Sequence, residues 1–379
     1  MSEVNDDLDD RDGAFDPIRM DAPIMPTLSM FSTDPSQAAD AARRVTAPGG
    51  YEGWHFAATS DDGCTHLAAA LHATWALDRG YLRRYWAYRR WPTRVAPPVP
   101  RRHPAVTFAL YERGRRPIVV AAPAPADDFA ADEGGRSVRV GGSHFQRGVG
   151  LDGILQLNLR ATTRDGRTMA TKLAFRPHAR GDCEVDLAGN TSSGTAADAS
   201  GGAPGGNGAA ARGGRHAWVI VDPLCDVNGE VSVFAEAGAA PRVIPFAGVG
   251  CHEHLYGSRP MGDAAEQWLS GRVLRDDRAV LFRRIGASGE AQVFDARGGE
   301  DGHARTAGVV TGGFARTGRN VVYPTTLTLA GLAELAEPKV VDSSWSGVVL
   351  EYRATIGNDR AIALVEVLRP RRVVWPLRW

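Results

Sequence analysis

Residues 347–368 read GVVLEYRATIGNDRAIALVEVL, and this stretch decides the fold class. It holds two short runs rich in apolar and β-branched residues, Gly347–Thr355 and Ala361–Leu368. The pair Gly357-Asn358 between them is typical of a tight turn. Two such runs joined by a turn predict a pair of antiparallel strands.

Similar runs recur at close spacing along the chain, separated by turn-forming pairs such as Asp165-Gly166 and Asn228-Gly229. Few segments have a helical period long enough for the crossover helices of a parallel sheet. We therefore predict an all-β protein of antiparallel strands, arranged as a sandwich or a barrel. The other runs are Ala105–Tyr111, Ile154–Arg160, Ala217–Val221, Val231–Phe234, Ala279–Arg283 and Val321–Leu329.

One segment does not fit this pattern. His66–Leu77 (HLAAALHATWAL) is rich in alanine and leucine, which favours a helix by propensity alone. Its secondary structure is left open.

The composition limits the size of the protein and its partners. The 379 residues are 43% hydrophobic, enough to bury a large core in roughly two domains. The 44 basic and 44 acidic side chains cancel, which disfavours nucleic acid as a partner. Lys172 and Lys339 are the only lysines, so chemistry that needs a lysine amine has few candidates.

Two stretches have a composition unlike the rest. Residues 1–45 are rich in Asp, Pro, Ser and Ala and predict a disordered leader, and residues 190–214 are nearly all Gly, Ala, Ser and Thr and predict a flexible loop. The acidic N-terminus does not resemble a signal peptide, and no apolar run is long enough to span a membrane. We therefore expect a cytoplasmic protein whose widely spaced cysteines, Cys64, Cys183, Cys225 and Cys251, are reduced.

Reactive side chains are densest in residues 248–262, GVGCHEHLYGSRPMG. On a strand, one face would carry Cys251, Glu253 and Leu255, and the other His252, His254 and Tyr256. Three interpretations stay open. The His-x-His pair is half of a metal site; Glu253 is a buried acid whose pKa is raised by apolar surroundings; or the residues form a polar strand edge.

Other motifs narrow the function. The chain has no phosphate-binding loop, no GxSxG elbow and no HExxH helix, and Gly248-Val249-Gly250 lacks the third glycine of a dinucleotide site. His216 and Trp218 share one face of a predicted strand. Indole rings, including Trp54, Trp268 and Trp345, either pack in the core or line a cavity for a long apolar ligand.

Three ordered blocks resemble the hydroxyneurosporene synthase, or carotenoid 1,2-hydratase, family. The first is YEGWHF at residues 51–56, followed by Asp61-Asp62-Gly63, and the second is His216-Ala217-Trp218. The third and most specific runs from Cys251 to Asp277-Arg278, and it includes Pro260-Met261-Gly262 and Trp268-Leu269-Ser270-Gly271-Arg272. The resemblance covers roughly residues 46–379.

The resemblance implies a tandem lipocalin-like fold of antiparallel β-barrels or sandwiches. It places an N-terminal domain at residues 46–240 and a C-terminal domain at residues 241–379. Relatives of this family include fungal Diels–Alderase-like pericyclases.

The resemblance also implies a reaction that needs neither cofactor nor metal. An acid protonates a terminal isoprenoid double bond, and water captures the tertiary cation. Carried over to this chain, the acid is Glu253, with His254 and His216 beside it. The substrate would contact Trp218, Cys251, Tyr256, Trp268 and Trp54.

Three substitutions depart from the family pattern. Glutamate replaces aspartate at Glu253, leucine replaces asparagine at Leu255, and cysteine replaces tyrosine at Cys251. The prediction is thus a hydratase of an apolar isoprenoid-like molecule, with two alternatives: a cyclase or pericyclase of a polyene or polyketide, and a lipocalin-like carrier without chemistry. An apolar substrate also allows peripheral contact with a membrane.

Overall fold

The computed structural model describes residues 39–148, 153–162, 166, 168–179, 181, 183–187, 216–234, 240–287, 289–300 and 302–374. All of these residues lie in one compact unit of the chain. The loop predicted at residues 190–214 and the first 38 residues of the predicted leader lie outside the described residues. No helix in the described part of the chain is long and apolar enough to cross a membrane.

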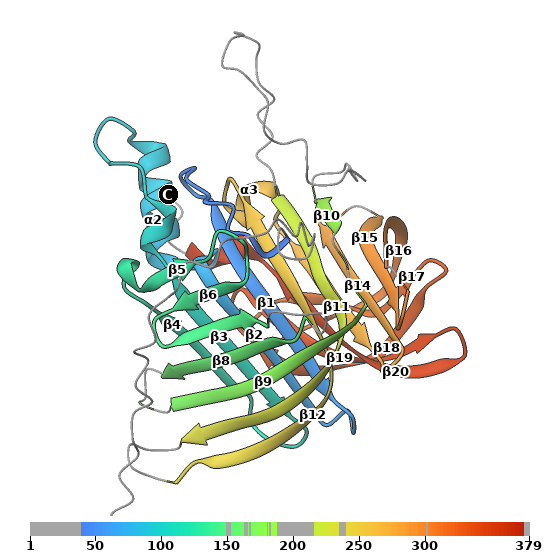
Figure 1. Ribbon diagram of the computed structural model, residues 1–379. Helices are drawn as coiled ribbons and strands as arrows, with labels where there is room; N and C mark the ends of the chain where they lie inside the picture. Colours follow the sequence, from blue (N-terminus) through green and yellow to red (C-terminus); the bar gives the residue numbers. More distant parts are fainter. Residues whose placement is uncertain are drawn as a thin grey trace, which may run out of the picture. The chain divides into compact units, whose positions relative to one another are not determined.

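The protein is all-β, as predicted, and its strands form two antiparallel sheets (Figure 1). The first sheet has the strand order β4-β3-β2-β1-β12-β11-β9-β8-β7-β6-β5, and β10 pairs with β11. Its strands are β1 (Tyr51–Ser60), β2 (Thr65–Thr74), β3 (Ala105–Glu112), β4 (Ile118–Pro123), β5 (Phe129–Ala131), β6 (Ser137–Val140), β7 (Ser143–Arg147), β8 (Leu155–Thr162), β9 (Thr168–Ala179), β10 (Cys183–Asp186), β11 (His216–Phe234) and β12 (Arg242–Gly257).

The second sheet closes into an eight-stranded barrel in which each strand pairs with the next and β13 pairs with β20. This is the up-and-down topology of a lipocalin-like barrel. Its strands are β13 (Trp268–Leu274), β14 (Arg278–Ile285), β15 (Glu290–Arg297), β16 (His303–Arg316), β17 (Val322–Leu329), β18 (Ala333–Ser343), β19 (Gly347–Ile356) and β20 (Asp359–Leu368).

Helical segments are short and lie between strands or after the barrel. They are the α-helices α2 (Arg79–Arg90) and α3 (Met261–Ala264), and the 3₁₀ helices η1 (Pro100–Arg102), η2 (Ala126–Asp128) and η4 (Pro370–Val374).

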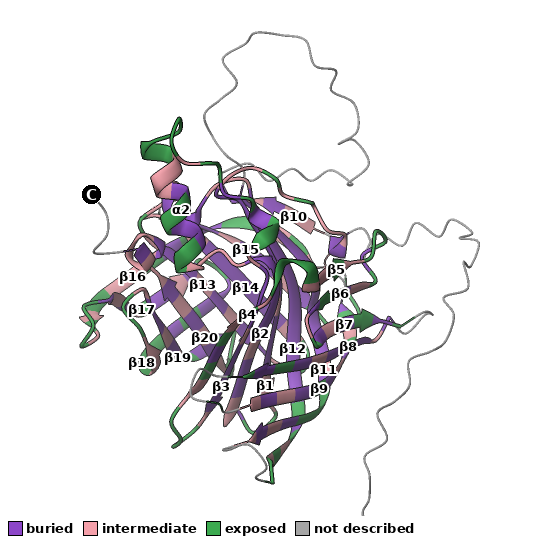
Figure 2. Cartoon of the chain, turned by 90° about the vertical axis from the view of Figure 1, so that its left-hand side faces the viewer, coloured by how far each residue is buried: buried purple, intermediate pink, exposed green. Residues whose placement is uncertain are grey.

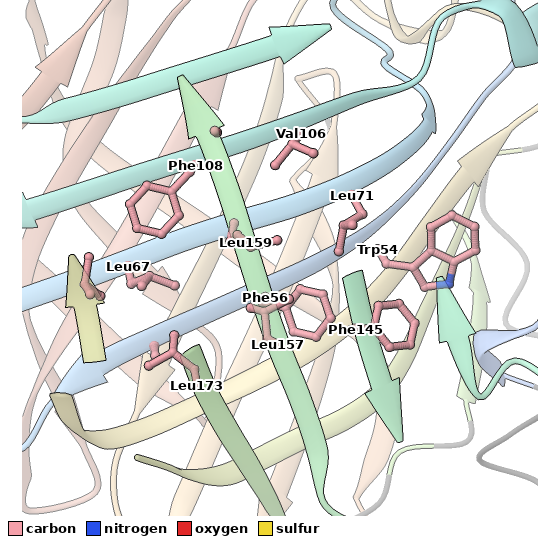
Figure 3. Close-up of a cluster of buried hydrophobic side chains, with 14 of the residues drawn as sticks. Trp54, Phe56, Leu67, Leu71, Val106, Phe108, Phe145, Leu157, Leu159 and Leu173 are labelled. Atoms are coloured by element: carbon pink, nitrogen blue, oxygen red, sulfur yellow. The ribbon is translucent and has the colours of Figure 1, made fainter. Parts of the chain in front are cut away.

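Alternation along the strands builds three large cores in the described residues, beside two smaller buried clusters. One core fills the curled first sheet, where Trp54, Phe56 and Phe145 meet side chains of β2, β3, β8 and β9 (Figure 3). A second fills the barrel with aliphatic side chains and Phe282. A third lies between the sheet and the barrel and includes Trp218. Buried residues accordingly run along β11 and β12, whereas exposed ones gather on the outer side of α2 (Figure 2).

The predicted strands are confirmed, including the hairpin of β19 and β20. The predicted turn at Asn228-Gly229 is wrong, because both residues pair on either side within β11, which joins the runs Ala217–Val221 and Val231–Phe234 into one strand. His66–Leu77, whose composition favours helix, contains strand β2. The segment pairs with β1 along one edge and with β3 along the other, which holds it in the extended conformation. Tertiary packing therefore overrides helix propensity here.

Two predicted borders can be placed on the structure. The border after residue 240 falls between β11 and β12, which are neighbours in the first sheet; the change of sheet comes after Gly257. Within the predicted leader, Asp40 is fully buried and accepts hydrogen bonds from His252 and Arg147. The ordered chain therefore begins before residue 46, because these buried ionic contacts hold Asp40 against the sheet.

Candidate functional site

A partly open cavity of about 360 Å³ lies between the first sheet and the outside of the barrel. One wall comes from β1 to β4 and the other from β13, β14, β19 and β20. Alternation decides which side chains reach it. On β1, Trp54 packs into the curled sheet, whereas Tyr51, Gly53 and His55 line the cavity.

Most of this wall is apolar, and its polar groups gather around Ser270 of β13. Ser270 pairs with Arg283 of β14 on one side and with Glu366 of β20 on the other. Arg272 lies two residues further along β13, on the same face, and all four residues line the cavity. One end of the cavity wall is thus a row of charged side chains.

Glu253 is buried behind this row and is held as an anion. Its Oε1 accepts a hydrogen bond from Arg272 Nε at 2.5 Å, and its Oε2 accepts bonds from Arg283 and Trp218 Nε1, both at 2.7 Å. Burial alone would raise the pKa of Glu253, but the charges and hydrogen bonds of Arg272 and Arg283 outweigh it and hold that pKa well below its usual range.

The sequence-based expectation for Glu253 is therefore wrong in one respect. We expected an acid kept neutral by apolar neighbours, but two guanidinium groups surround it. Because Glu253 is ionised and its oxygens are occupied, it has no proton to donate. Its carboxylate forms ion pairs with Arg272 and Arg283, which both line the cavity.

Glu366 has the properties that we expected of Glu253. Its neighbours on β20 that face the cavity are Leu364 and Leu368, and no described residue forms a hydrogen bond with its carboxyl group. Burial raises the pKa of Glu366, the nearby Arg272 and Arg283 oppose this, and the charge of Glu253 adds to it. The result is a carboxyl group that faces the cavity and has a pKa raised above its usual value.

Two histidines lie on the opposite wall. The ring of His55 faces the cavity and forms an edge contact with His72, with ring centroids 5.4 Å apart. A Cβ atom at Gly53 would lie 2.5 Å from Nδ1 of His72, so glycine is required for the ring to lie there. Burial lowers the pKa of His72 to about 3 and that of His55 well below its usual value. Both rings are therefore neutral.

The predicted residues His216 of β11 and Trp268 of β13 are in contact, and of the two only Trp268 lines the cavity. Their rings form an edge contact with centroids 5.3 Å apart. Arg259 Nε donates a hydrogen bond to Nε2 of His216 at 3.2 Å. Nδ1 of His216 therefore carries the ring proton, and it donates a hydrogen bond to the Tyr51 hydroxyl at 2.9 Å. Burial lowers the pKa of His216 to about 4. His216 thus positions Tyr51, which lines the cavity.

Trp218 and Cys251 surround Glu253 within the core between sheet and barrel. Trp218 stacks under the Arg283 guanidinium at 5.3 Å, and the Cys251 thiol lies 3.7 Å from Glu253 Oε1. Burial raises the pKa of Cys251 to about 12, which keeps it a thiol. Neither residue lines the cavity.

His254, Trp54 and Tyr256 lie on the other face of the first sheet, away from the cavity. The His254 ring stacks on the Trp54 ring, with centroids 4.6 Å apart. The His254 ring also forms a tilted contact with the Tyr256 ring. The two nitrogens of His254 contact the Ala39 carbonyl at 3.0 Å and Glu52 Oε1 at 3.1 Å. The alternation of β12 was predicted correctly, and it separates these residues from Glu253.

Metal binding is not supported by the His-x-His pair. His252 contacts the His55 carbonyl at 3.1 Å and Asp40 Oδ1 at 2.7 Å, so both nitrogens of each histidine already face protein acceptors. Among the residues that the structure describes, no group of three or more His, Cys, Asp or Glu could hold a metal ion.

Sequence reasoning missed Glu366, His55 and Arg283. Glu366 interrupts the apolar run ALVEVL, and a charged residue inside such a run was the available signal. The third sequence block, in contrast, is explained by the site. In Trp268-Leu269-Ser270-Gly271-Arg272, alternate residues face the cavity, and Gly271 leaves space for the Phe282 ring inside the barrel.

A curled sheet, a closed eight-stranded barrel and a cavity between them define a tandem lipocalin-like protein. A crystal structure of an AttH candidate from Nitrosomonas europaea has the same fold, with a TM-score of 0.56 at 15% identity over 92% of this chain and 99% of that one. The crystal structure of CghA has a TM-score of 0.45 at 11% identity over 85% of this chain and 88% of that one. No protein-family model matches the sequence.

A relative found by sequence comparison is hydroxyneurosporene dehydrogenase of Chlorobaculum tepidum. The two chains are 28% identical over 256 residues, which covers 66% of this chain and 61% of the relative. The chain thus matches less than two thirds of that protein's length. This similarity confirms the resemblance to the hydroxyneurosporene family that the sequence blocks indicate.

Proposed function

We propose that the protein is a carotenoid 1,2-hydratase-like enzyme, a hydro-lyase that adds water across a terminal double bond of an acyclic isoprenoid chain. The observation that carries this proposal is Glu366, a half-buried carboxylic acid without a hydrogen-bond partner among the described residues, on the wall of a mainly apolar cavity. The carotenoid substrate is inferred from the name of the relative. We place the reaction in the cytoplasm.

The proposed reaction has two steps. The Glu366 carboxyl group donates its proton to the terminal carbon, and the π electrons form the new C–H bond, which leaves a tertiary cation on the neighbouring carbon. Water then adds to this cation, and the Glu366 carboxylate accepts the proton that the water releases. The sum is one water added to one double bond, so no cofactor is required.

The charges at the wall support the first step. Glu253, Arg272 and Arg283 together carry a charge of −1 + 2 = +1. When Glu366 loses its proton, the cluster becomes neutral. The preorganised guanidinium groups thus stabilise the carboxylate that proton transfer creates. Tyr51 and Trp268 present aromatic rings to the cavity, which favour a nearby cation.

The cavity also limits how much of the substrate it can hold. Its volume of about 360 Å³ is at the lower end of the range of about 300–1,000 Å³ for sites that take drug-sized ligands. It therefore suits one end of a long polyene, with the remaining chain extending outward. The neutral His55 ring on the opposite wall is positioned to accept a hydrogen bond from the attacking water.

The test is mass spectrometry of carotenoids from a host that makes acyclic polyenes and expresses the wild type, Glu366→Gln or the exposed control Glu334→Gln. We expect a product heavier by one water from the wild type and the control, and at least about 100-fold less from Glu366→Gln. Full activity of Glu366→Gln would overturn Glu366 as the acid.

The same experiment separates the alternatives. An isomeric product that Glu366→Gln still makes indicates a pericyclase or cyclase, and unchanged bound ligand in all variants indicates a carrier. A product lighter by two hydrogens would indicate the dehydrogenase activity in the relative's name.

The pH dependence gives a second readout. Because the pKa of Glu366 is raised, the acid form is present below that pKa and is lost as the pH rises through it. We expect turnover by the purified enzyme to decrease with rising pH along a single titration. A rate that increases over this range would contradict a Glu366 proton donor.

A further inference from the structure

The surface beside the cavity carries a dense group of arginines. Residues 79–103 hold eight, and no aspartate or glutamate. All eight are exposed. The chain as a whole has no net charge, so this concentration is a local feature. The eight are Arg79, Arg83, Arg84, Arg89, Arg90, Arg94, Arg101 and Arg102. We call them the arginine surface.

The helix α2 presents part of this surface in a fixed orientation. Its buried side is anchored because Tyr81 donates a hydrogen bond to the Gly50 carbonyl at 2.8 Å and Tyr85 donates one to Asp263 at 2.8 Å. The opposite side carries Arg83 and Arg90, which are seven residues apart and so point the same way. Figure 2 shows this outer side of α2 as exposed.

An exposed indole adjoins the arginines. Trp91 ends the helix and is 47% exposed, and the Arg90 guanidinium lies 5.5 Å from its ring centroid. Tryptophan next to basic side chains is typical of surfaces that contact the interface of a bilayer.

The arginine surface is continuous with the cavity. Trp75, Ala76 and Leu77 line the cavity and directly precede Asp78, the N-terminal cap of α2. The 3₁₀ helix η4 packs on α2 through Val374 and adds Arg371 and Arg372. A molecule bound to this surface would therefore lie next to the cavity.

We propose that the arginine surface docks on an anionic lipid bilayer. The charge is complementary to acidic lipid headgroups, and each basic side chain near such a surface strengthens binding by about fivefold. Docking here would bring the lipid phase next to Trp75–Leu77, so an apolar molecule could pass between bilayer and cavity. Only this last step rests on the proposed function.

The test is sedimentation of the full chain with vesicles of phosphatidylcholine alone or vesicles rich in phosphatidylglycerol, at low and high salt. The variant replaces Arg83, Arg84, Arg89 and Arg90 with glutamine. The matched control replaces four exposed arginines on other elements, Arg116, Arg139, Arg297 and Arg305, with glutamine. We expect binding to the anionic vesicles only, weakened by salt, unchanged in the control and reduced at least about 20-fold in the variant.

Trp91→Ala serves as a second variant that leaves the charge intact. It should weaken binding at both salt concentrations, because the tryptophan contribution is not electrostatic. Equal loss in the control and the arginine variant would overturn the proposal, as would binding to a DNA duplex with none to anionic vesicles. Because vesicle binding is measured without turnover, failure of the hydratase proposal would leave this result unaffected.

Discussion

At the scale of single residues, the chemistry of the site depends on which of two glutamates, Glu253 or Glu366, is hydrogen-bonded to the arginines. Glu253 has three strong donors within 2.7 Å and stays ionised, whereas Glu366 has none among the described residues and its pKa is raised. Both lie in the same cluster with Arg272 and Arg283, but Glu253 is buried and Glu366 is half-buried. The difference arises because Glu253 lies behind the guanidinium groups and Glu366 lies beside them, facing the cavity.

Removing the charge of Glu253 should destabilise the protein. In Glu253→Gln, two buried guanidinium groups lose their counter-charge, which typically costs roughly 3–5 kcal/mol. Urea unfolding at neutral pH measures this. The control is Asp295→Asn, which loses a partly exposed pair with Arg278 and should cost less than about 1 kcal/mol. An equal, small loss in both variants would mean that Glu253 does not anchor the two arginines.

At the scale of elements, strand β12 holds the first sheet together through both of its faces. One face carries Glu253 toward the barrel, and the other carries His252 and His254 into a second buried ionic cluster. In that cluster Arg147 of β7 lies 2.7 Å from Asp222 of β11 and 2.9 Å from Asp40. These contacts join the segment before β1 to strands that are distant in sequence.

We expect Arg147→Met to break this connection. The change keeps most of the side-chain volume but leaves the carboxylates of Asp40 and Asp222 buried without their shared cation, at a cost of roughly 3–5 kcal/mol. Proteolysis should then cleave the chain near Asp40 before the strands. Denaturation and timed digestion, with Arg353→Met at an exposed pair on the barrel as control, measure both effects. Unchanged digestion near Asp40 would show that Arg147 does not hold this segment.

Much of the element-level description could be predicted from sequence. The alternation of apolar and polar residues, together with the turn-forming pairs, predicted the antiparallel strands. The same two-residue alternation predicted which face of its strand carries Glu253. The partners of Glu253 could not be predicted, because Arg283 is distant in sequence and reaches it only when the barrel packs on the sheet. The same holds for Glu366, whose pKa depends on burial against β1 to β4. Most of His66–Leu77 became a strand for a similar reason, since it pairs with β1 and β3 along its two edges.

At the scale of the whole molecule, the ligand site lies between the two sheets. The barrel interior is filled by side chains such as Phe282 and Val365, so it leaves the interface cavity as the place for an apolar molecule. Neither sheet forms this cavity alone. Residues from β1 and β20, more than 300 positions apart in the chain, face each other across it.

Filling the cavity should therefore block ligand binding without unfolding either sheet. Ala68 of β2 lines the cavity and is half-buried, so Ala68→Phe places a ring in open space. We expect little change in Tm and a large loss of bound polyene, measured as pigment retained per folded protein after gel filtration. The control Val365→Phe overpacks the barrel interior, so it should lower Tm by the equivalent of about 1–3 kcal/mol while folded molecules keep their ligand. If Ala68→Phe retains pigment and Val365→Phe loses it, the ligand lies inside the barrel. Because Glu366 faces outward from the barrel, the cavity would then not be the ligand site and Glu366 would not be the acid.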